Sequence, residues 1–252
     1  MAWILIAFFF TPVSLAGEYP EEIQIAVISD VPITAAAAHI LQLAYQRLGV
    51  RMTTVHSPAR RALMMADTGL VDGGMFRTSH AANIYPNLVQ VEHVLLKGEL
   101  RAVVLPGNGH VLNMPSTKPR KVAVRRGVII AERMATELGM EPVSANTYEQ
   151  ARQLLKYGRV DVAFISHIED FGPLALKDWQ EFEILPEPVT RFNLYHFLNQ
   201  RHEALAKALP NVLRQIEEEG TKKRILDSFR GRPNEGSVER SPLKKQQTHL
   251  QA

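Results

Sequence analysis

The chain has 252 residues, 46% of them hydrophobic, which is enough to bury a substantial core and excludes a chain that is disordered throughout. The formal net charge is only +3, and part of this excess lies in the C-terminal tail. The folded body therefore lacks the strongly basic surface of a nucleic-acid-binding protein. The chain contains no cysteine, which excludes disulfides, thiolate metal sites and cysteine nucleophiles.

The N-terminus has the pattern of a secretory signal. Residues 2–10 form an uninterrupted apolar run that is too short to span a bilayer, and the small-residue pattern Ser14-Leu15-Ala16 follows it. We therefore expect residues 1–16 to be a signal peptide and the mature protein to be periplasmic. No Lys or Arg precedes the run, so the basic start of a signal is missing. The alternative for this segment is a buried first strand.

The first half of the chain predicts a βαβαβ unit. Apolar runs at 23–28 and 51–55 favour strands, and the helix between them ends at Gly49. A second helix at 59–66 leads to Gly69, and the segment that ends at Arg77 is a third strand. This order fits a right-handed, doubly wound sheet.

One pattern occurs twice. Each copy follows an amphipathic helix and consists of a glycine, Val-Asp and a short apolar strand, from Gly69 to Arg77 and again from Gly158 to Ser166. Each glycine stands where a helix ends in a positive-φ residue. Asp72 and Asp161 begin their strands, so we interpret them as structural caps or turn residues at the edge of the sheet away from a ligand.

The second half predicts another βαβαβ unit followed by helices. Residues 120–124 favour a strand, 128–138 a helix, and residues 191–197 a strand that returns to the first half. Helices are expected at 203–218 and 222–229, with Pro210 able to split the first. Residues 231–252 lack apolar periodicity and predict a disordered tail.

The ordered set of these segments resembles the type II periplasmic solute-binding proteins, in particular the family-3 group that includes receptors for polar amino acids. The resemblance runs from about Glu22 to Phe229 and includes Ser29-Asp30 after the first strand, the unit ending in Arg77, and Lys121 to Gly127. It implies an α/β fold of two lobes, each a mostly parallel sheet flanked by helices.

The resemblance also implies domain boundaries and partners. Lobe 1 would comprise residues 17–100 and 199–230, and lobe 2 residues 106–190, with crossings at 101–105 and 191–198. Such proteins close on a small ligand by hinge bending. A small-molecule ligand, an ABC-transporter permease and a monomeric state are implied, with no cofactor, metal or nucleic acid.

The strongest candidate for ligand binding is Arg77, because a guanidinium can hold a carboxylate through two charge-assisted hydrogen bonds. In the resembled family an arginine in this region often has that role. The alternative is an arginine on the lobe surface or one paired with Asp30. Asp30 itself could accept from a ligand ammonium or cap the next helix.

Further candidates come from both lobes. Arg125 and Gly127 precede a helix N-terminus, where free N–H groups favour an anion. Arg60 could reach the cleft from the first repeat helix, and Ser166 and His167 end the last strand of the second lobe.

Two departures from the family put an α-amino-acid ligand in doubt. Ser166 stands where amino-acid receptors commonly place an aspartate, and Glu169 or Asp170 is the alternative carboxylate. Residues 31–34 also lack the aromatic side chain that usually stacks on such ligands.

No catalytic or metal-binding motif stands out, so the leading hypothesis is a non-enzymatic binding protein for a small anionic or zwitterionic solute. One alternative is a dehydratase or lyase that shares the fold, with Asp30, Glu169 or His167 as general acid. Another is a sensory module that docks on a membrane receptor.

Overall fold

The computed structural model describes residues 19–28, 31, 33–112, 118–169, 171 and 179–230. The expected signal peptide at 1–16, the expected tail at 231–252 and the candidate Asp30 lie outside the described residues.

The first part of the chain forms the predicted βαβαβ unit and then a long strand. Its elements are β1 (Glu22–Ile28), α1 (Thr34–Arg47), β2 (Arg51–Ser57), α2 (Ala59–Asp67), β3 (Gly73–Arg77), α3 (Ala81–Ile84) and β4 (Leu88–Val104).

The second part repeats the alternation and then returns to the first. Its elements are β5 (Lys121–Arg125), α4 (Ile129–Glu137), β6 (Glu141–Ala145), α5 (Tyr148–Lys156), β7 (Val162–Ile168), β8 (Glu183–Ile184), β9 (Thr190–Asn199), the 3-10 helix η3 (Gln200–His202), α6 (Glu203–Glu218) and α7 (Thr221–Phe229). Helix α6 continues through Pro210, so the proline does not divide it into two helices.

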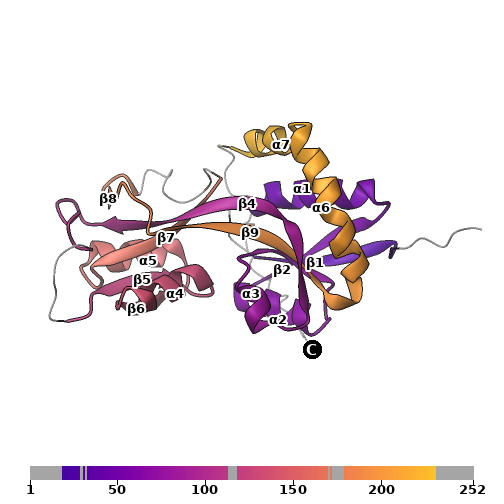
Figure 1. The fold of residues 1–252 in the computed structure, drawn as a ribbon. Coiled ribbons are helices and arrows are strands. Elements are labelled where there is room, and N and C mark those ends of the chain that lie inside the picture. The colour runs from indigo at the N-terminus through magenta and orange to yellow at the C-terminus, as the bar shows by residue number, and fades with distance from the viewer. Residues whose placement is uncertain are drawn as a thin grey trace, which may run out of the picture.

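The strands form one curled sheet in the order β2-β1-β3-β9-β4-β7-β5-β6, with β8 beside β4. In each half the outer strands are parallel, whereas β9 and β4 pair antiparallel in the middle. Figure 1 shows β4 and β9 running side by side from one half of the molecule into the other. These two strands join the two lobes.

Strand β4 is one long strand, although the polar residues Lys97 and Glu99 and the glycine between them interrupt its apolar sequence. Its pairing with β9 shifts register between Gln90 and Val94 and between Val94 and Leu96. The two strands remain paired on both sides of these irregularities. Residues 98–103 pair with β7. The predicted crossing at 101–105 thus begins on the part of β4 that pairs with β7, and the crossing at 191–198 lies within β9. The boundaries of the lobes stay a prediction.

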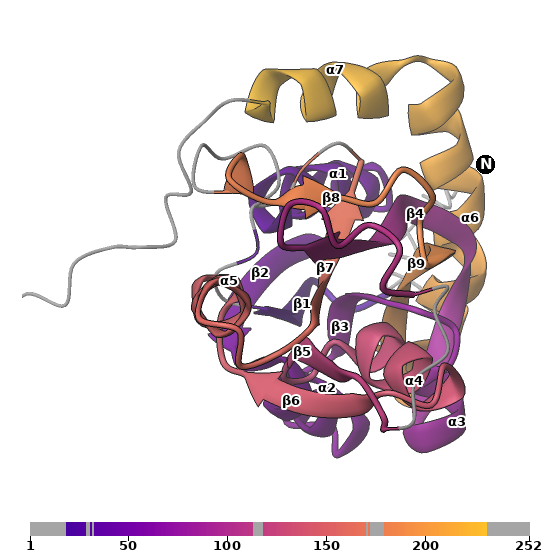
Figure 2. The same ribbon diagram turned by 90° about the vertical axis from the view of Figure 1, so that its left-hand side faces the viewer.

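Helices cover both faces of each half of the sheet. In the first half α1, α6 and α7 pack on one face, and α2 packs on the other. In the second half, Val122 and Val124 face α4, whereas Ala123 faces α5. Figure 2 views this second half end-on, with α4 and α5 on either side of β5. The alternation of buried residues explains why these short strands are apolar throughout.

The two aspartates of the repeat act as structural anchors. Asp72 Oδ2 accepts from the Gln24 N–H at 2.7 Å, and Asp161 Oδ2 accepts from the Lys121 N–H at 2.8 Å. In return Asp72 N–H donates to Gln24 O and Asp161 N–H donates to Lys121 O. Each aspartate therefore holds its strand against the first strand of its own lobe.

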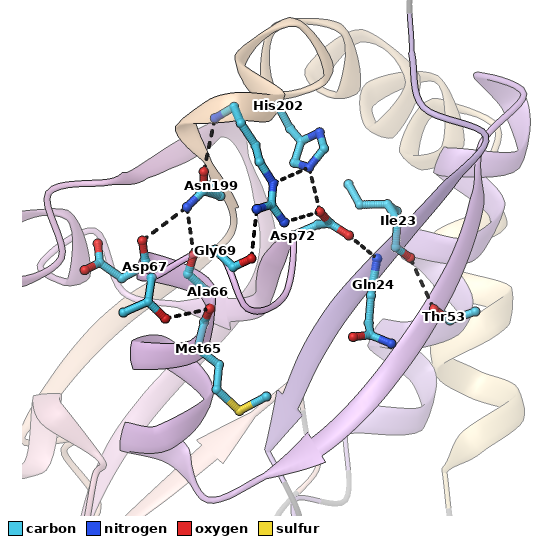
Figure 3. A network of polar contacts seen from close by, with 12 residues as sticks. Ile23, Gln24, Thr53, Met65, Ala66, Asp67, Gly69, Asp72, Asn199 and His202 are labelled. Carbon is cyan, nitrogen blue, oxygen red and sulfur yellow. Dashed lines mark hydrogen bonds and ion pairs between the residues drawn. The ribbon is translucent and has the colours of Figure 1, made fainter.

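Asp72 has additional partners that Asp161 does not share among the described contacts. Its Oδ1 accepts from the Arg201 guanidinium and from His202 Nε2 at 2.7 Å (Figure 3). Burial raises the pKa of Asp72, but the hydrogen bonds from Gln24, Arg201 and His202 outweigh it and hold the pKa below its ordinary value. This network ties the segment after β9 to the first repeat.

A histidine is buried in the core of the first lobe. His196 is fully buried, and its Nδ1 lies 2.9 Å from Gly74 O and 3.1 Å from Met75 O. Both carbonyls only accept, so Nδ1 carries the proton and Nε2 accepts from the Tyr45 hydroxyl at 2.7 Å. Burial lowers the pKa of His196 to about 4.

Candidate functional site

A cleft lies where the two lobes meet beside the crossing strands. The empty space in it is about 820 Å³ when the open mouth is included. Part of its lining comes from the carboxyl ends of the parallel strands, as expected for open α/β sheets. The first lobe contributes Ile28, Val31, Ala59, Phe76, Arg77 and Thr78. The second lobe contributes Arg125, Gly127, Val128, Tyr148, Ser166 and Ile168.

Arg77 reaches the cleft from the end of β3. Between Gly74 and Arg77 strand β3 has one residue more than its partner β9, and a bulge of this kind re-aims the side chains near it. Consequently the consecutive residues Phe76 and Arg77 both line the cleft.

The Arg77 side chain is only 6% exposed. Its Nη1 donates to Phe76 O at 2.6 Å and its Nη2 donates to Ala59 O at 3.0 Å, whereas Nε is buried without a hydrogen-bond partner. Among the described residues, no carboxylate forms an ion pair with it. Burial lowers the pKa of Arg77 to about 10, still well above neutrality. The cleft therefore contains a buried cation whose charge the described chain does not neutralise.

Ser166 occupies the matching position in the second repeat. It is 8% exposed, its N–H donates to the Tyr148 hydroxyl at 3.3 Å, and its buried Oγ has no hydrogen-bond partner among the described residues. The Arg125 guanidinium lies 5.2 Å from the centre of the Tyr148 ring, a cation–π distance. Arg77, Ser166 and Arg125 thus all line the same cleft, and their role in ligand binding stays a prediction.

Gly127 and Arg60 take part in a contact between the lobes. The Gly127 N–H donates to Glu132 Oε1 at 2.9 Å, and Arg60 Nη2 donates to Glu132 Oε2 at 3.2 Å. The carboxylate of Glu132 therefore already occupies the N–H group that we expected to bind an anion. At Gly127, where φ is +80°, an added Cβ would lie 2.9 Å from the Cβ of Ala59. Helix α2 and the loop before α4 consequently touch at close range.

His167 does not line the cleft. Side chains alternate along β7, so Ser166 and Ile168 line the cleft whereas His167 lies between them on the other face, opposite Glu99 of β4. Glu169 does not line the cleft either, and its Oε1 accepts from the Lys97 N–H at 2.9 Å. Because side chains alternate between the two faces of a strand, the sequence alone could have predicted that Ser166 and His167 lie on opposite faces of β7.

The sequence also did not single out the aromatic part of the lining. Phe76, Tyr148, Phe171 and Phe192 all border the cleft. Phe192 comes from the crossing strand β9, where the sequence indicated only a return strand. Pairing with β4 brings it to the cleft, and such pairing leaves no local sequence signal.

Within the described ranges, no group of three or more acidic or histidine side chains is arranged to hold a metal ion. No described helix combines the length and the apolar character needed to cross a membrane.

Solved structures share this fold. An amino-acid ABC transporter substrate-binding protein from Streptococcus pneumoniae, AbpA, bound to L-arginine, matches with a TM-score of 0.66 and 14% identity over 87% of this chain and 97% of its own. The ancestral amino acid-binding protein AncCDT-1, a precursor of cyclohexadienyl dehydratase, matches with a TM-score of 0.65 and 18% identity over 83% and 95%. The fold is that of the two-lobed periplasmic binding proteins.

Sequence comparison adds a relative but no activity. An uncharacterized protein of Shewanella oneidensis is 27% identical over 243 residues, which cover 86% of this chain and 89% of the relative. No protein-family model matches the chain.

Proposed function

We propose that this protein is an exported solute-binding protein that captures a small carboxylate between its lobes for uptake through an ABC-transporter permease. The observation that carries the proposal is Arg77, which is 6% exposed, lines the cleft and pairs with no described carboxylate. A buried charge without a counterion costs several kcal/mol. An anionic ligand would offset that cost, so its binding is favoured at this point of the cleft.

The close contact between the lobes supports capture by closure. Arg60 and Gly127 belong to different lobes and share Glu132 as hydrogen-bond acceptor. A ligand bound beside this contact would be enclosed on both sides. The ABC-transporter proteins that share the fold are binding proteins for amino acids, and this likeness favours a similar role.

We expect binding without turnover. The described lining contains no Asp, Glu or His, and neither His167 nor Glu169 borders the cleft. A general acid would have to come from elsewhere, such as Asp30.

The test is calorimetric titration of purified, ligand-free protein with L-amino acids and small carboxylates. Arg77→Met should lower affinity for any ligand found by at least about 30-fold, because a desolvated charge partner is worth roughly 2–5 kcal/mol. The matched control is Arg61→Met, since Arg61 is an exposed arginine outside the cleft. Unchanged affinity in Arg77→Met, or no binding of any carboxylate, would overturn the proposal.

A further inference from the structure

The described lining of the cleft is mostly apolar. Besides Arg77, Arg125 and Arg126, its polar side chains carry only the hydroxyls of Thr78, Tyr148 and Ser166. The remaining lining is aliphatic or aromatic, and much of it is deeply buried: Phe76 is 4% exposed, Leu194 6% and Ile168 8%. Such a lining offers few partners for a polar ligand side chain.

Three adjacent strands, β9, β4 and β7, form an apolar wall of the cleft. Gly98 of β4 pairs with Phe192 of β9 on one side and with Ile168 of β7 on the other. Phe192 and Ile168 both line the cleft, so three adjacent strands place an aromatic ring and a branched side chain on either side of a glycine.

Gly98 makes room for the Phe192 ring. A Cβ at position 98 would lie 2.5 Å from Cε2 of Phe192, so the ring occupies the space over the glycine backbone. Glycine inside a strand often marks such a close approach. The Phe192 ring is thereby held where it borders the cleft and contacts the cores of both lobes.

We propose that the natural ligand is a carboxylate whose remaining part is apolar, either aromatic or branched aliphatic, and that Phe192 over Gly98 forms the wall that selects it. This inference rests on the proposed function, because Arg77 must first hold the carboxylate. Burying a phenyl or isobutyl group against such a wall is worth about 30-fold in affinity. A basic side chain would instead lose water without finding a carboxylate among the described lining residues, and an acidic one would have only Arg126 and Arg125, which stacks on Tyr148, as further partners.

The experiment compares matched ligands by calorimetric titration of the purified protein. The apolar probes are 3-phenylpropanoate, 4-methylpentanoate, L-phenylalanine and L-leucine, and the polar probes are L-glutamate and L-arginine. The best apolar probe should bind at least 30-fold more tightly than either polar probe. Comparing each apolar amino acid with its amine-free analogue then reads out whether an ammonium also contributes, and either order is consistent with the proposal.

Two variants test the wall itself. Phe192→Ala should weaken the apolar probes by at least 10-fold, and Gly98→Ala should weaken them too, because its new methyl group displaces the ring. Tyr157→Ala is the matched control, since Tyr157 is an aromatic residue that is 69% exposed and outside the cleft. Thermal unfolding of each ligand-free variant shows whether it has folded, and Phe192→Leu replaces Phe192→Ala if the latter has not.

The outcomes separate this inference from the proposed function. If L-glutamate or L-arginine binds as tightly as the apolar probes and Arg77→Met abolishes that binding, the apolar selectivity is wrong and the solute-binding function stands. Apolar binding that is unchanged in folded Phe192 and Gly98 variants also overturns the selecting wall. If no carboxylate binds, both proposals fall.

Discussion

The two repeats of helix, glycine, Val-Asp and strand are alike where they build the scaffold and different where they face the cleft. Gly69 and Gly158 both have positive φ, and Asp72 and Asp161 make the same pair of hydrogen bonds to a neighbouring strand. At the other end of the strands, Arg77 and Ser166 are both buried, and each has a polar atom without a hydrogen-bond partner in the described structure. The shared residues therefore fix the position of the strands, and the divergent ends are where we propose that the ligand binds.

The largest expected difference between the repeats is in ligand affinity. Arg77→Met should cost about 4 kcal/mol of binding free energy, whereas Ser166→Ala should cost about 1 kcal/mol, because only the former removes a buried charge partner. Titration calorimetry with the best ligand checks this. Equal losses would mean that the two strand ends contribute alike.

Acid should destabilise the first lobe through His196. Its pKa is ordinarily near 6.5 and is lowered to about 4 in the fold, so the unfolded chain takes up a proton first as pH falls. Stability is thus fully present above pH about 6.5 and is lost as pH falls to about 4, by about 3 kcal/mol in total. Urea unfolding between pH 7 and 4 measures this. His196→Gln should flatten the profile, and an unchanged slope would assign the loss to other groups.

The two anchoring aspartates should differ in their effect on stability. Both Asp72→Ala and Asp161→Ala remove a bond to a backbone N–H, but only Asp72→Ala also leaves Arg201 and His202 without their acceptor. We expect Asp72→Ala to be more destabilising than Asp161→Ala by about 2 kcal/mol. Urea unfolding of the two variants at pH 7 gives the difference. Equal values would show that the additional contacts contribute nothing.

The smallest expected effect tests the contact between the lobes. Gly127→Ala should weaken ligand binding about 5- to 10-fold, because the new Cβ would meet Ala59 when the lobes touch. Gly158→Ala is the control: φ is +60° there and the added Cβ meets nothing within 4 Å. It should lower stability by about 1 kcal/mol and leave affinity unchanged. The same affinity loss in both variants would indicate backbone strain alone.

Much of the scaffold could be predicted because its signals are local. Apolar periodicity, the positive-φ glycines and the Val-Asp repeat locate the strands that bring Arg77 and Ser166 to one cleft. The hydrogen bond from the Gly127 N–H to Glu132 could not be predicted from such local signals, because it depends on the conformation of the turn before α4. The position of Phe192 depends on pairing between strands about a hundred residues apart along the chain. The continuous strand β4 was hidden by Lys97-Gly98-Glu99, which interrupt its apolar pattern.

The pairing of β4 with β9 has a mechanical consequence. Since the two strands run as one ribbon through both lobes, a rotation of one lobe against the other can occur by twisting the ribbon, with its backbone ladder intact. The register shifts at Gln90–Val94 and Val94–Leu96 are the places where the ladder is already irregular. If the lobes open and close as we propose, the motion would then depend on backbone dihedrals of these two strands rather than on hydrogen bonds that must break and re-form.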